Sequence, residues 1–394
     1  MRCIPIKNKT NYSKKGIVFL KISTPKEGVK CMFLNKNTTT AYYCTIYSKS
    51  FLILQRIQPF MKTPPIKYSI LDLALVSKDH TLQQTFANAL TLAQHAETFG
   101  YTRYWLAEHH NATNIGSSAT AILIGYVAAG TKTLRIGSGG IMLPNHSPLI
   151  VAEQFGTLAS LYPNRIDLGL GRAPGTDRET AQAIRADFMQ AAQSFPTELD
   201  KIQQYFSANN ASARVRATVA EGVEVPIYLL GSSTDSAHLA AKKGIPYAFA
   251  SHFATTHLFE ALKIYRKEFQ PSNDLEKPYV MAGVNIIVAD TDEEAQRLST
   301  SLIRMIVGIF TGKRDSVQPP TAMTTEFKEI LQNPQVHQML KFSFIGSKAT
   351  VKQQVKEFIA QTNADELIAV TNIYDGKDRI RSFELFAEIM KELH

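Results

Sequence analysis

Residues 134–177 read LRIGSGGIMLPNHSPLIVAEQFGTLASLYPNRIDLGLGRAPGTD, and this stretch decides the fold. Arg135–Leu143 and Arg165–Ala173 have the length and apolar content of buried strands, whereas Pro148–Leu161 has apolar residues at helical spacing. Ser147 stands directly before a proline at the first helical position, which is a typical helix start. Two strands joined through a helix pair in parallel, because an antiparallel pair needs no crossover. The stretch therefore predicts a strand–helix–strand unit of an α/β protein.

The same pattern continues on both sides of this unit. Six further strands are predicted at Tyr68–Val76, Thr102–Glu108, Pro226–Ser233, Tyr247–Phe253, Tyr279–Asp290 and Glu366–Tyr374. Helical patterns cover Thr81–Phe99, Ser118–Ala129, Ser236–Lys243, Thr256–Phe269, Val351–Gln361 and Arg379–Leu393. The first of them begins with Thr81-x-x-Gln84, which predicts a capping box. Eight parallel strands that alternate with helices predict a (β/α)8 TIM barrel. A doubly wound open sheet is the alternative, but its G-x-G-x-x-G motif is missing after the first strand.

Two connections between the predicted strands are much longer than the others. Residues 174–225 separate the fourth strand from the fifth, and residues 291–365 separate the seventh from the eighth. Because one helix is enough to connect neighbouring strands of such a barrel, we expect insertions after strands 4 and 7.

The net charge of the chain is concentrated near its N-terminus. The 394 residues include 43 Lys and Arg and 34 Asp and Glu, which gives a formal charge of +9. Residues 1–60 contain 11 of the basic residues and one acidic residue, so residues 61–394 have a net charge of −1. The lysines are scattered, which does not favour a nucleic-acid-binding arm. No apolar run reaches the roughly 18 residues of a spanning helix, so neither nucleic acid nor a membrane is an expected partner.

The three cysteines, Cys3, Cys31 and Cys44, also lie within residues 1–60. They form no C-x-x-C pair, so a zinc site is not supported. The apolar stretch of this segment is too short for a secretory signal, and the segment is not Arg-rich as a transit peptide would be. We interpret residues 1–60 as a non-native or unstructured N-terminal extension and residues 61–394 as the barrel domain. A domain without cysteine has no disulfides, which fits a cytoplasmic protein.

Candidate catalytic residues are expected at the carboxyl ends of the strands, where the active sites of TIM barrels form. The second strand ends in Glu108 and is followed by His109 and His110. Adjacent side chains point in different directions, so we expect one histidine to face the barrel mouth as a general base or hydrogen-bond donor. The other histidine would be structural. A metal site would need Glu108 and His252 as further ligands, but the usual histidine spacing is absent, so no metal is expected.

A second group of strand-end residues suits an anion. Gly231, Ser232 and Ser233 lead into a predicted helix. That helix begins near Ser236, and its free N–H groups and the serine hydroxyls could hold a phosphate. Arg172, at the end of the fourth strand, adds a permanent positive charge. The alternative is that the serines only cap the helix.

Gly139 and Gly140 lie inside the third predicted strand. Glycine weakens a strand and usually marks the close approach of another backbone or of a ligand. One interpretation is a shelf for a flat aromatic ligand at the barrel mouth. The other interpretation is a simple bulge.

Three segments of the chain resemble the bacterial luciferase-like flavin monooxygenase family. They are WLAEHHNATNIGSSAT at 105–120, the opening stretch at 134–177, and LLGSSTDSAHLAAKKGIPYAFASHF at 229–253. The resemblance covers roughly residues 68–390 and is nearest to the single-chain relatives of luciferase. It implies that His109 is the catalytic histidine and that Glu108 is its neighbour in the pocket.

The resemblance also implies how a flavin is held and used. Gly139 and Gly140 fall where the family has a non-prolyl cis peptide beneath the isoalloxazine ring. The implied phosphate-binding residues are Arg172, Gly231, Ser232, Ser233 and Ser236. The implied cofactor is FMN in its reduced form, with O2 as co-substrate and a small organic molecule as substrate. A separate flavin reductase would supply the reduced FMN.

Some features leave the function open. Gly171 stands where luciferase has a reactive cysteine, and residues 291–365 do not resemble its mobile lid. Both departures weaken a prediction of light emission or of an aldehyde substrate. The alternatives are a deazaflavin-dependent hydride-transfer enzyme of the same fold and a non-catalytic flavin-binding protein. Apolar positions on Pro148–Leu161 suit a homodimer or a higher homo-oligomer.

Overall fold

The computed structural model describes residues 65–394, apart from Arg314 and His394, and the backbone of four strands within residues 1–64. The chain divides into two compact units, Met1–Pro65 and Ile66–His394. The first unit holds an antiparallel sheet of β1 (Ile17–Ser23), β2 (Val29–Asn35), β3 (Ala41–Ile46) and β4 (Leu52–Arg56), in that order. The interpretation of residues 1–60 as a non-native or unstructured extension stays a prediction.

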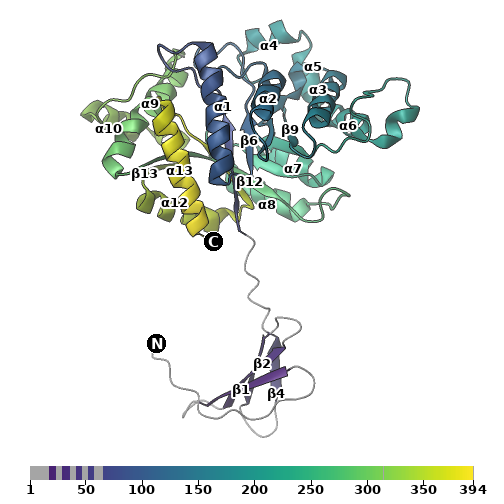
Figure 1. The fold of residues 1–394 in the computed structure, drawn as a ribbon, viewed down its shortest axis with the longest axis vertical. Coiled ribbons are helices and arrows are strands. Elements are labelled where there is room, and N and C mark those ends of the chain that lie inside the picture. The colour runs from purple at the N-terminus through teal and green to yellow at the C-terminus, as the bar shows by residue number, and fades with distance from the viewer. Residues whose placement is uncertain are drawn as a thin grey trace. The chain divides into compact units, whose positions relative to one another are not determined.

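Eight parallel strands of the second unit close into a barrel, which confirms the predicted (β/α)8 fold (Figure 1). In ring order they are β5 (Lys67–Asp72), β6 (Arg103–Leu106), β7 (Arg135–Ser138), β9 (Ile166–Gly171), β10 (Ile227–Gly231), β11 (Tyr247–Phe249), β12 (Val280–Ala289) and β14 (Glu366–Val370). The ring closes because β14 pairs with β5, and β10 pairs with both β9 and β11. All eight carboxyl ends therefore lie at one end of the barrel, which we call the mouth.

Helices surround the barrel (Figure 1). They include α1 (Leu82–Phe99), α2 (Thr120–Ala129), α3 (Pro148–Leu161), α7 (Thr234–Lys243), α8 (Leu258–Glu268), α12 (Lys348–Thr362) and α13 (Gly376–Glu392). The start of α1 is the capping box that its sequence predicts, because Thr81 and Gln84 satisfy each other's backbone N–H groups. Among the residues that the structure describes, no helix is both long and apolar enough to cross a bilayer.

The two long connections carry further elements. Between β9 and β10 lie α4 (Arg178–Ile184), α5 (Phe188–Gln193), α6 (Phe195–Phe206) and the 3-10 turn η2 (Ala208–Ser212). Between β12 and α12 lie α9 (Asp292–Thr311), α10 (Thr325–Gln332), α11 (Pro334–Met339) and β13 (Ser343–Ser347). The sequence pattern does not predict β13, which pairs with the second half of the ten-residue β12. Serine and glycine make up much of this short strand, so its formation depends on the tertiary pairing.

All eight predicted strands extend beyond the observed ones, four of them by several residues. The sequence predicts one strand over Arg135–Leu143, whereas the structure separates β7 from β8 (Ile141–Met142) at the two central glycines. The predictions also continue β5 to Val76, β11 to Phe253 and β14 to Tyr374. The backbone of these segments leaves the sheet to form the loops of the mouth, as the positive φ of Ala74 (49°) shows for the first of them.

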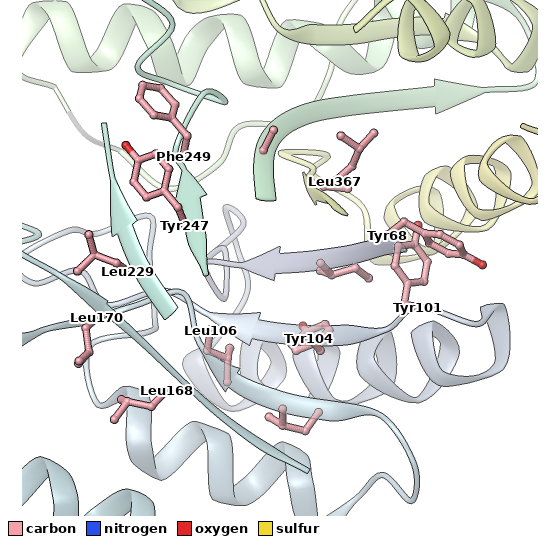
Figure 2. Packing of buried hydrophobic residues seen from close by; sticks show 14 of the residues in the cluster. Tyr68, Tyr101, Tyr104, Leu106, Leu168, Leu170, Leu229, Tyr247, Phe249 and Leu367 are labelled. Carbon is pink, nitrogen blue, oxygen red and sulfur yellow. The ribbon is translucent and has the colours of Figure 1, made fainter. Parts of the chain in front are cut away.

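Strand alternation divides the apolar residues of the barrel into two layers. The outer layer packs between strands and helices, and Figure 2 shows part of it, including Tyr104, Leu106, Leu168 and Leu170. The inner layer fills the barrel and includes Leu71, Trp105, Ala248, Met281 and Ile368. Successive strand residues face opposite sides, so the neighbours Tyr104 and Trp105 belong to different layers. The inner layer forms an apolar floor under the mouth.

A buried ionic network lies at the amino ends of the strands. Arg103 donates from Nε and Nη2 to the two carboxylate oxygens of Glu366, at 2.8 and 3.1 Å, and from Nη1 to Asp167 at 2.7 Å. Arg103 also donates to the hydroxyl of Tyr228 at 2.7 Å, and Tyr279 donates to Glu366 at 2.6 Å. Paired charges thus close this end of the barrel, and we expect ligands at the mouth.

Candidate active site

Small residues line the mouth side of the barrel interior. Ala107 and Gly139 directly follow β6 and β7, and Gly283 of β12 lies against the side chain of His252. The large side chains of the floor, such as Trp105 and Met281, lie two residues earlier on β6 and β12. Small side chains above an apolar floor are what a flat ligand at the mouth would need.

His109 follows β6 and is fixed to the loop after β9. Its backbone N–H donates to the carbonyl oxygen of Ser117 at 3.2 Å, and its Nδ1 lies 3.1 Å from the carbonyl oxygen of Gly175. A carbonyl oxygen only accepts hydrogen bonds, so Nδ1 carries the proton of the neutral ring. Nε2 is then the nitrogen that takes up or releases a proton. This arrangement suits a general acid or base whose tautomer is set by a fixed hydrogen bond.

Gly175 is a site residue that the sequence patterns did not indicate. Its carbonyl oxygen also accepts a hydrogen bond from the backbone N–H of His110 at 3.2 Å. Its φ is +67°, and a Cβ at this position would lie 2.6 Å from the carbonyl oxygen of Glu108. Any other residue would be strained and would push the two loops apart. Pro174 and Gly175 mark a turn in the sequence, but only the fold shows that this turn meets the histidines.

Glu108 is buried, with a side chain that is only 1% exposed. Its carboxylate accepts hydrogen bonds from His110 Nε2 and His146 Nε2, each at 2.9 Å, from Asn145 Nδ2 at 3.0 Å and from the backbone N–H of Met142 at 2.9 Å. Burial raises the pKa of Glu108, but the hydrogen bonds from the two histidines and Asn145 outweigh burial and lower this pKa to about 2. Glu108 therefore fixes the end of β6 to the segment that carries Asn145 and His146, and His110 takes part in the same hydrogen-bond network.

The peptide bond between Gly139 and Gly140 is cis, as the family resemblance implies. A Cβ on Gly139 would lie 2.6 Å from the side chain of Leu71 and 3.0 Å from that of Trp105. A Cβ on Gly140 would lie 2.6 Å from the carbonyl oxygen of Gly169. Neighbouring strands thus require glycine at both positions, whether or not a ligand binds. The contact of these glycines with a flavin stays a prediction.

Arg172 and the start of α7 lie together at the mouth. The side chain of Arg172 is 51% exposed, and its Nη2 forms a long pair of 3.4 Å with Asp235 in the first turn of α7. Ser233 is the N-cap of α7, but its side chain makes no capping hydrogen bond. The first N–H groups of a helix have no partner within the helix. The guanidinium, the Ser233 hydroxyl and these N–H groups together can therefore bind an anion.

Ser236, which the family resemblance assigns to the phosphate, directs its hydroxyl into the protein. Its Oγ donates to the carbonyl oxygen of Ser233 at 2.7 Å and lies 2.9 Å from the hydroxyl of Tyr247. The single hydrogen of this hydroxyl is used, so it cannot also donate to an anion. Gly231 lies beside the same hydroxyl, because a Cβ on Gly231 would collide with Ser236. Gly231 and Ser236 therefore shape the turn that carries Ser232 and Ser233 at the mouth.

His252 follows β11, across the barrel from β6. The sequence suggested it together with Glu108 as a possible metal ligand, but the carboxylate of Glu108 is surrounded by four donors. Within residues 65–394, apart from Arg314 and His394, no group of three or more His, Cys, Asp or Glu side chains is arranged to hold a metal ion. His252 is therefore considered below as a histidine of the mouth.

Comparison with known sequences places this site in a family. The sequence profile of the luciferase-like monooxygenases matches residues 66–366. A luciferase-like monooxygenase of Escherichia coli (strain K12) is 46% identical over 333 residues, which cover 84% of this chain and 99% of that protein. An N-acetyl-S-alkylcysteine monooxygenase of Bacillus subtilis (strain 168) is 31% identical over 336 residues, which cover 82% of this chain and 98% of that protein.

Solved structures show the same fold. Apo-MsnO8 has a TM-score of 0.75 at 31% identity, over 83% of this chain and 98% of that one. The oxygenating constituent of 3,6-diketocamphane monooxygenase from Pseudomonas putida, in complex with FMN, has a TM-score of 0.63 at 16% identity, over 82% and 97% of the two chains. An F420-dependent secondary alcohol dehydrogenase has a TM-score of 0.60 at 14% identity, over 84% and 99%. The profile match and the relatives above 30% identity show that the chain belongs to the luciferase-like monooxygenase family.

Proposed function

We propose that the protein is a flavin-dependent monooxygenase that uses reduced FMN and O2 to oxidise a small organic substrate. The observation that carries this proposal is the setting of His109. Its Nδ1 is held by Gly175, and it stands at the same mouth as Arg172 and the start of α7, which follow the second and third strands from β6 in the ring. A protein that only stores flavin needs the anion site but not an oriented histidine.

The residues of the mouth fit FMN. Arg172, the hydroxyls of Ser232 and Ser233 and the first N–H groups of α7 form a donor set that matches a phosphate dianion. A phosphate bound there would replace the long pair between Arg172 and Asp235. Bound at this mouth, reduced FMN would supply the two electrons that the activation of O2 requires.

The protein's own contribution is proton transfer and orientation at His109. With Nδ1 hydrogen-bonded to Gly175, Nε2 can take a proton from the reacting group or return one. General acid–base catalysis of this kind typically contributes about 10²–10⁴-fold to the rate. Glu108 acts indirectly, because its hydrogen bonds fix the strand end that carries His109. The apolar floor keeps water away from one side of the site.

Relatives support oxygenation of a small organic molecule. The relative from Bacillus subtilis is a monooxygenase of N-acetyl-S-alkylcysteines, and the diketocamphane enzyme with this fold binds FMN. The F420-dependent dehydrogenase shows that the same fold also serves a deazaflavin. A test of the proposed function therefore has to separate the two cofactors.

We also propose two protein partners. The chain has no G-x-G-x-x-G dinucleotide motif, so a separate flavin reductase would supply reduced FMN. A second copy of the chain would cover the apolar face of α2 and α3, where Ile122 (74% exposed), Tyr126 and Ile150 lie on neighbouring helices. Light scattering of the purified protein measures whether it is a dimer.

Residues 1–60 are not needed for the proposed activity. The family profile begins to match at residue 66, and the relatives align with only 82–84% of this chain. Deletion of residues 1–60 should leave FMN affinity unchanged, and a folded truncated protein that cannot bind FMN would contradict this. A barrel domain without cysteines suits the cytoplasm.

Spectroscopic titration tests the cofactor. The purified chain is titrated with FMN and with F420, and binding is followed by the change in flavin absorption. Binding of FMN supports the proposal, and binding of F420 alone overturns it. Oxygen uptake is then measured with reduced FMN and a panel of small thioethers and ketones. FMN binding without any substrate-dependent oxygen uptake would assign the protein to flavin storage.

Replacement of the mouth histidine tests the mechanism. His109→Gln should bind FMN with unchanged affinity but oxidise substrate about 10²–10⁴-fold more slowly, because the proton acceptor is lost. The matched control is His95→Gln, which changes an exposed histidine of α1 and should have no effect. An undiminished rate in folded His109→Gln would remove His109 from the mechanism.

A further inference from the structure

A second histidine stands at the mouth, on the side opposite His109. His252 follows β11, which is the fourth strand from β6 in either direction around the ring. The two histidines are nevertheless close enough to interact electrostatically. Burial, and secondly the charge of His109, lower the pKa of His252 to about 4. The ring of His252 is therefore neutral at physiological pH.

The backbone around His252 is firmly held. Its carbonyl oxygen accepts a hydrogen bond from Asn285 Nδ2 at 2.5 Å, and the neighbouring Ser251 donates to the carbonyl oxygen of Gly283 at 2.6 Å. The imidazole makes an edge-to-face contact with Phe253, with ring centroids 4.9 Å apart. These contacts join the loop after β11 to β12. They set the position of the imidazole but use neither of its nitrogens.

The Nδ1 atom of His252 is buried and has no hydrogen-bond partner among the described residues. It lies against Gly283, where a Cβ would approach it to 2.5 Å, so the glycine makes room for the ring. The residue as a whole is only half-buried, so solvent reaches other parts of the side chain. A buried polar atom without a partner destabilises a protein, and each such atom in a native structure calls for an explanation.

This environment selects the tautomer of His252. A neutral imidazole carries one proton, on either Nδ1 or Nε2. A buried N–H without an acceptor is rarer in proteins than an acceptor without a donor, which favours the proton on Nε2. His109 has the opposite tautomer, because its Nδ1–H bonds to Gly175. When His109 is neutral, the mouth thus combines an unprotonated Nε2 on His109 with an N–H donor on His252.

We propose that His252 is a catalytic hydrogen-bond donor of this site, which contacts the reacting group of the bound substrate from the side opposite His109. A neutral donor stabilises negative charge that develops on an oxygen without giving up its own proton. His109 exchanges the proton while His252 stabilises the charge. This assignment rests on the proposed function and names a second residue that performs it.

Three substitutions separate a donor role from a packing role. His252→Gln keeps an N–H group near the position of Nε2, His252→Asn reaches only the position of Nδ1, and His252→Phe keeps a flat ring without a donor. The proposal predicts that the Phe and Asn variants lower kcat of substrate-dependent oxygen uptake by about 10²–10³-fold, as expected for loss of such a donor. The Gln variant should recover part of this loss. FMN affinity should be unchanged in all three.

A packing role predicts another order of activities. His252→Phe would then be close to the wild type, and the two amides would be worse, which would overturn the proposal. Thermal unfolding shows which variants are folded, and His257→Gln, at an exposed histidine before α8, is the matched control. Failure of the wild-type chain to bind FMN or to consume oxygen would instead count against the proposed function.

A cofactor-free measurement keeps the two proposals distinguishable. NMR of the protein with ¹⁵N-labelled histidine reports which ring nitrogen of His252 carries the proton, with His252→Gln used for assignment. The Nε2–H tautomer at pH 7 is expected. The Nδ1–H tautomer, or a charged ring at this pH, would overturn the donor role whatever cofactor the protein binds.

Discussion

The two ends of the barrel use polar residues in different ways. At the amino ends of the strands, Arg103, Asp167 and Glu366 pair with one another inside the barrel. At the mouth, Nδ1 of His252 is buried without a partner among the described residues, and Arg172 forms only a long, exposed pair. A buried charge is tolerated only while its partners are present, whereas polar groups without strong partners in the protein can bind a ligand. The closed end therefore stabilises the fold, whereas the polar groups of the mouth are available to a ligand.

The largest effect is expected at the closed end. Arg103→Met leaves the carboxylates of Asp167 and Glu366 buried without their cation, which should lower the free energy of unfolding by about 3–5 kcal/mol. Arg381→Met, the control, breaks only exposed ion pairs and should lower it by less than about 1 kcal/mol. Urea unfolding followed by circular dichroism measures both values. Equal losses in the two variants would show that the buried network does not stabilise the barrel.

A smaller, pH-dependent effect is expected from Glu108 at the mouth. The pKa of its carboxyl group is about 2 in the folded protein, against an ordinary value of 4.5. Because the folded pKa is the lower one, the carboxylate stabilises the fold above about pH 4.5, and this stabilisation is lost as the pH falls toward about 2. At about 1.4 kcal/mol per pKa unit, its contribution at neutral pH is on the order of 3 kcal/mol.

Glu108→Gln checks this contribution. The variant should be less stable than the wild type at pH 7, and its stability should fall less steeply between about pH 5 and pH 3. Urea unfolding at several pH values gives both slopes, and Glu384→Gln, at an exposed glutamate of α13, is the control. Identical slopes in Glu108→Gln and the wild type would mean that Glu108 does not titrate as described.

The smallest effect concerns Arg172. Arg172→Met should weaken FMN binding by about 10- to 100-fold, as expected for loss of a charge-assisted hydrogen bond. The affinity for riboflavin, which lacks the phosphate, should not change. Arg178→Met, at an exposed arginine of α4, should change neither affinity. Calorimetric titration measures the FMN and riboflavin affinities of each variant. An equal loss of affinity for FMN and for riboflavin in Arg172→Met would exclude Arg172 as the phosphate ligand.

Helices and strands whose apolar residues repeat with a clear period were predictable from the sequence. A strand that forms only because it pairs with another strand was not. The strand–helix alternation and the capping box of α1 are local patterns, and the structure confirms both. The strand β13 escaped prediction because its residues form a strand only beside β12. The break between β7 and β8 likewise follows from the close approach of Leu71, Trp105 and Gly169 to the two glycines.

Some features of the candidate site were likewise predictable from the sequence, and others only the structure shows. Strand-end position pointed to the pair His109 and His110, to Arg172 and to the start of α7, because parallel strands bring their carboxyl ends together. The family resemblance then selected His109 from the pair. Spacing could not show that the hydroxyl of Ser236 turns into the protein. It also could not show that His252 approaches His109, since the two residues follow opposite strands of the ring.

The sequence by itself determined the fold class and the set of residues near the mouth, because periodicity and strand order are properties of the chain. Only the tertiary structure decided what each of these residues can do. Gly175 fixes the tautomer of His109 from 66 residues further along the chain, and three of the four donors around Glu108 (Met142, Asn145 and His146) lie beyond the next strand, β7. Hydrogen bonds between loops that are far apart in the sequence set the proton positions and pKa values. These hydrogen bonds form only once the barrel has closed.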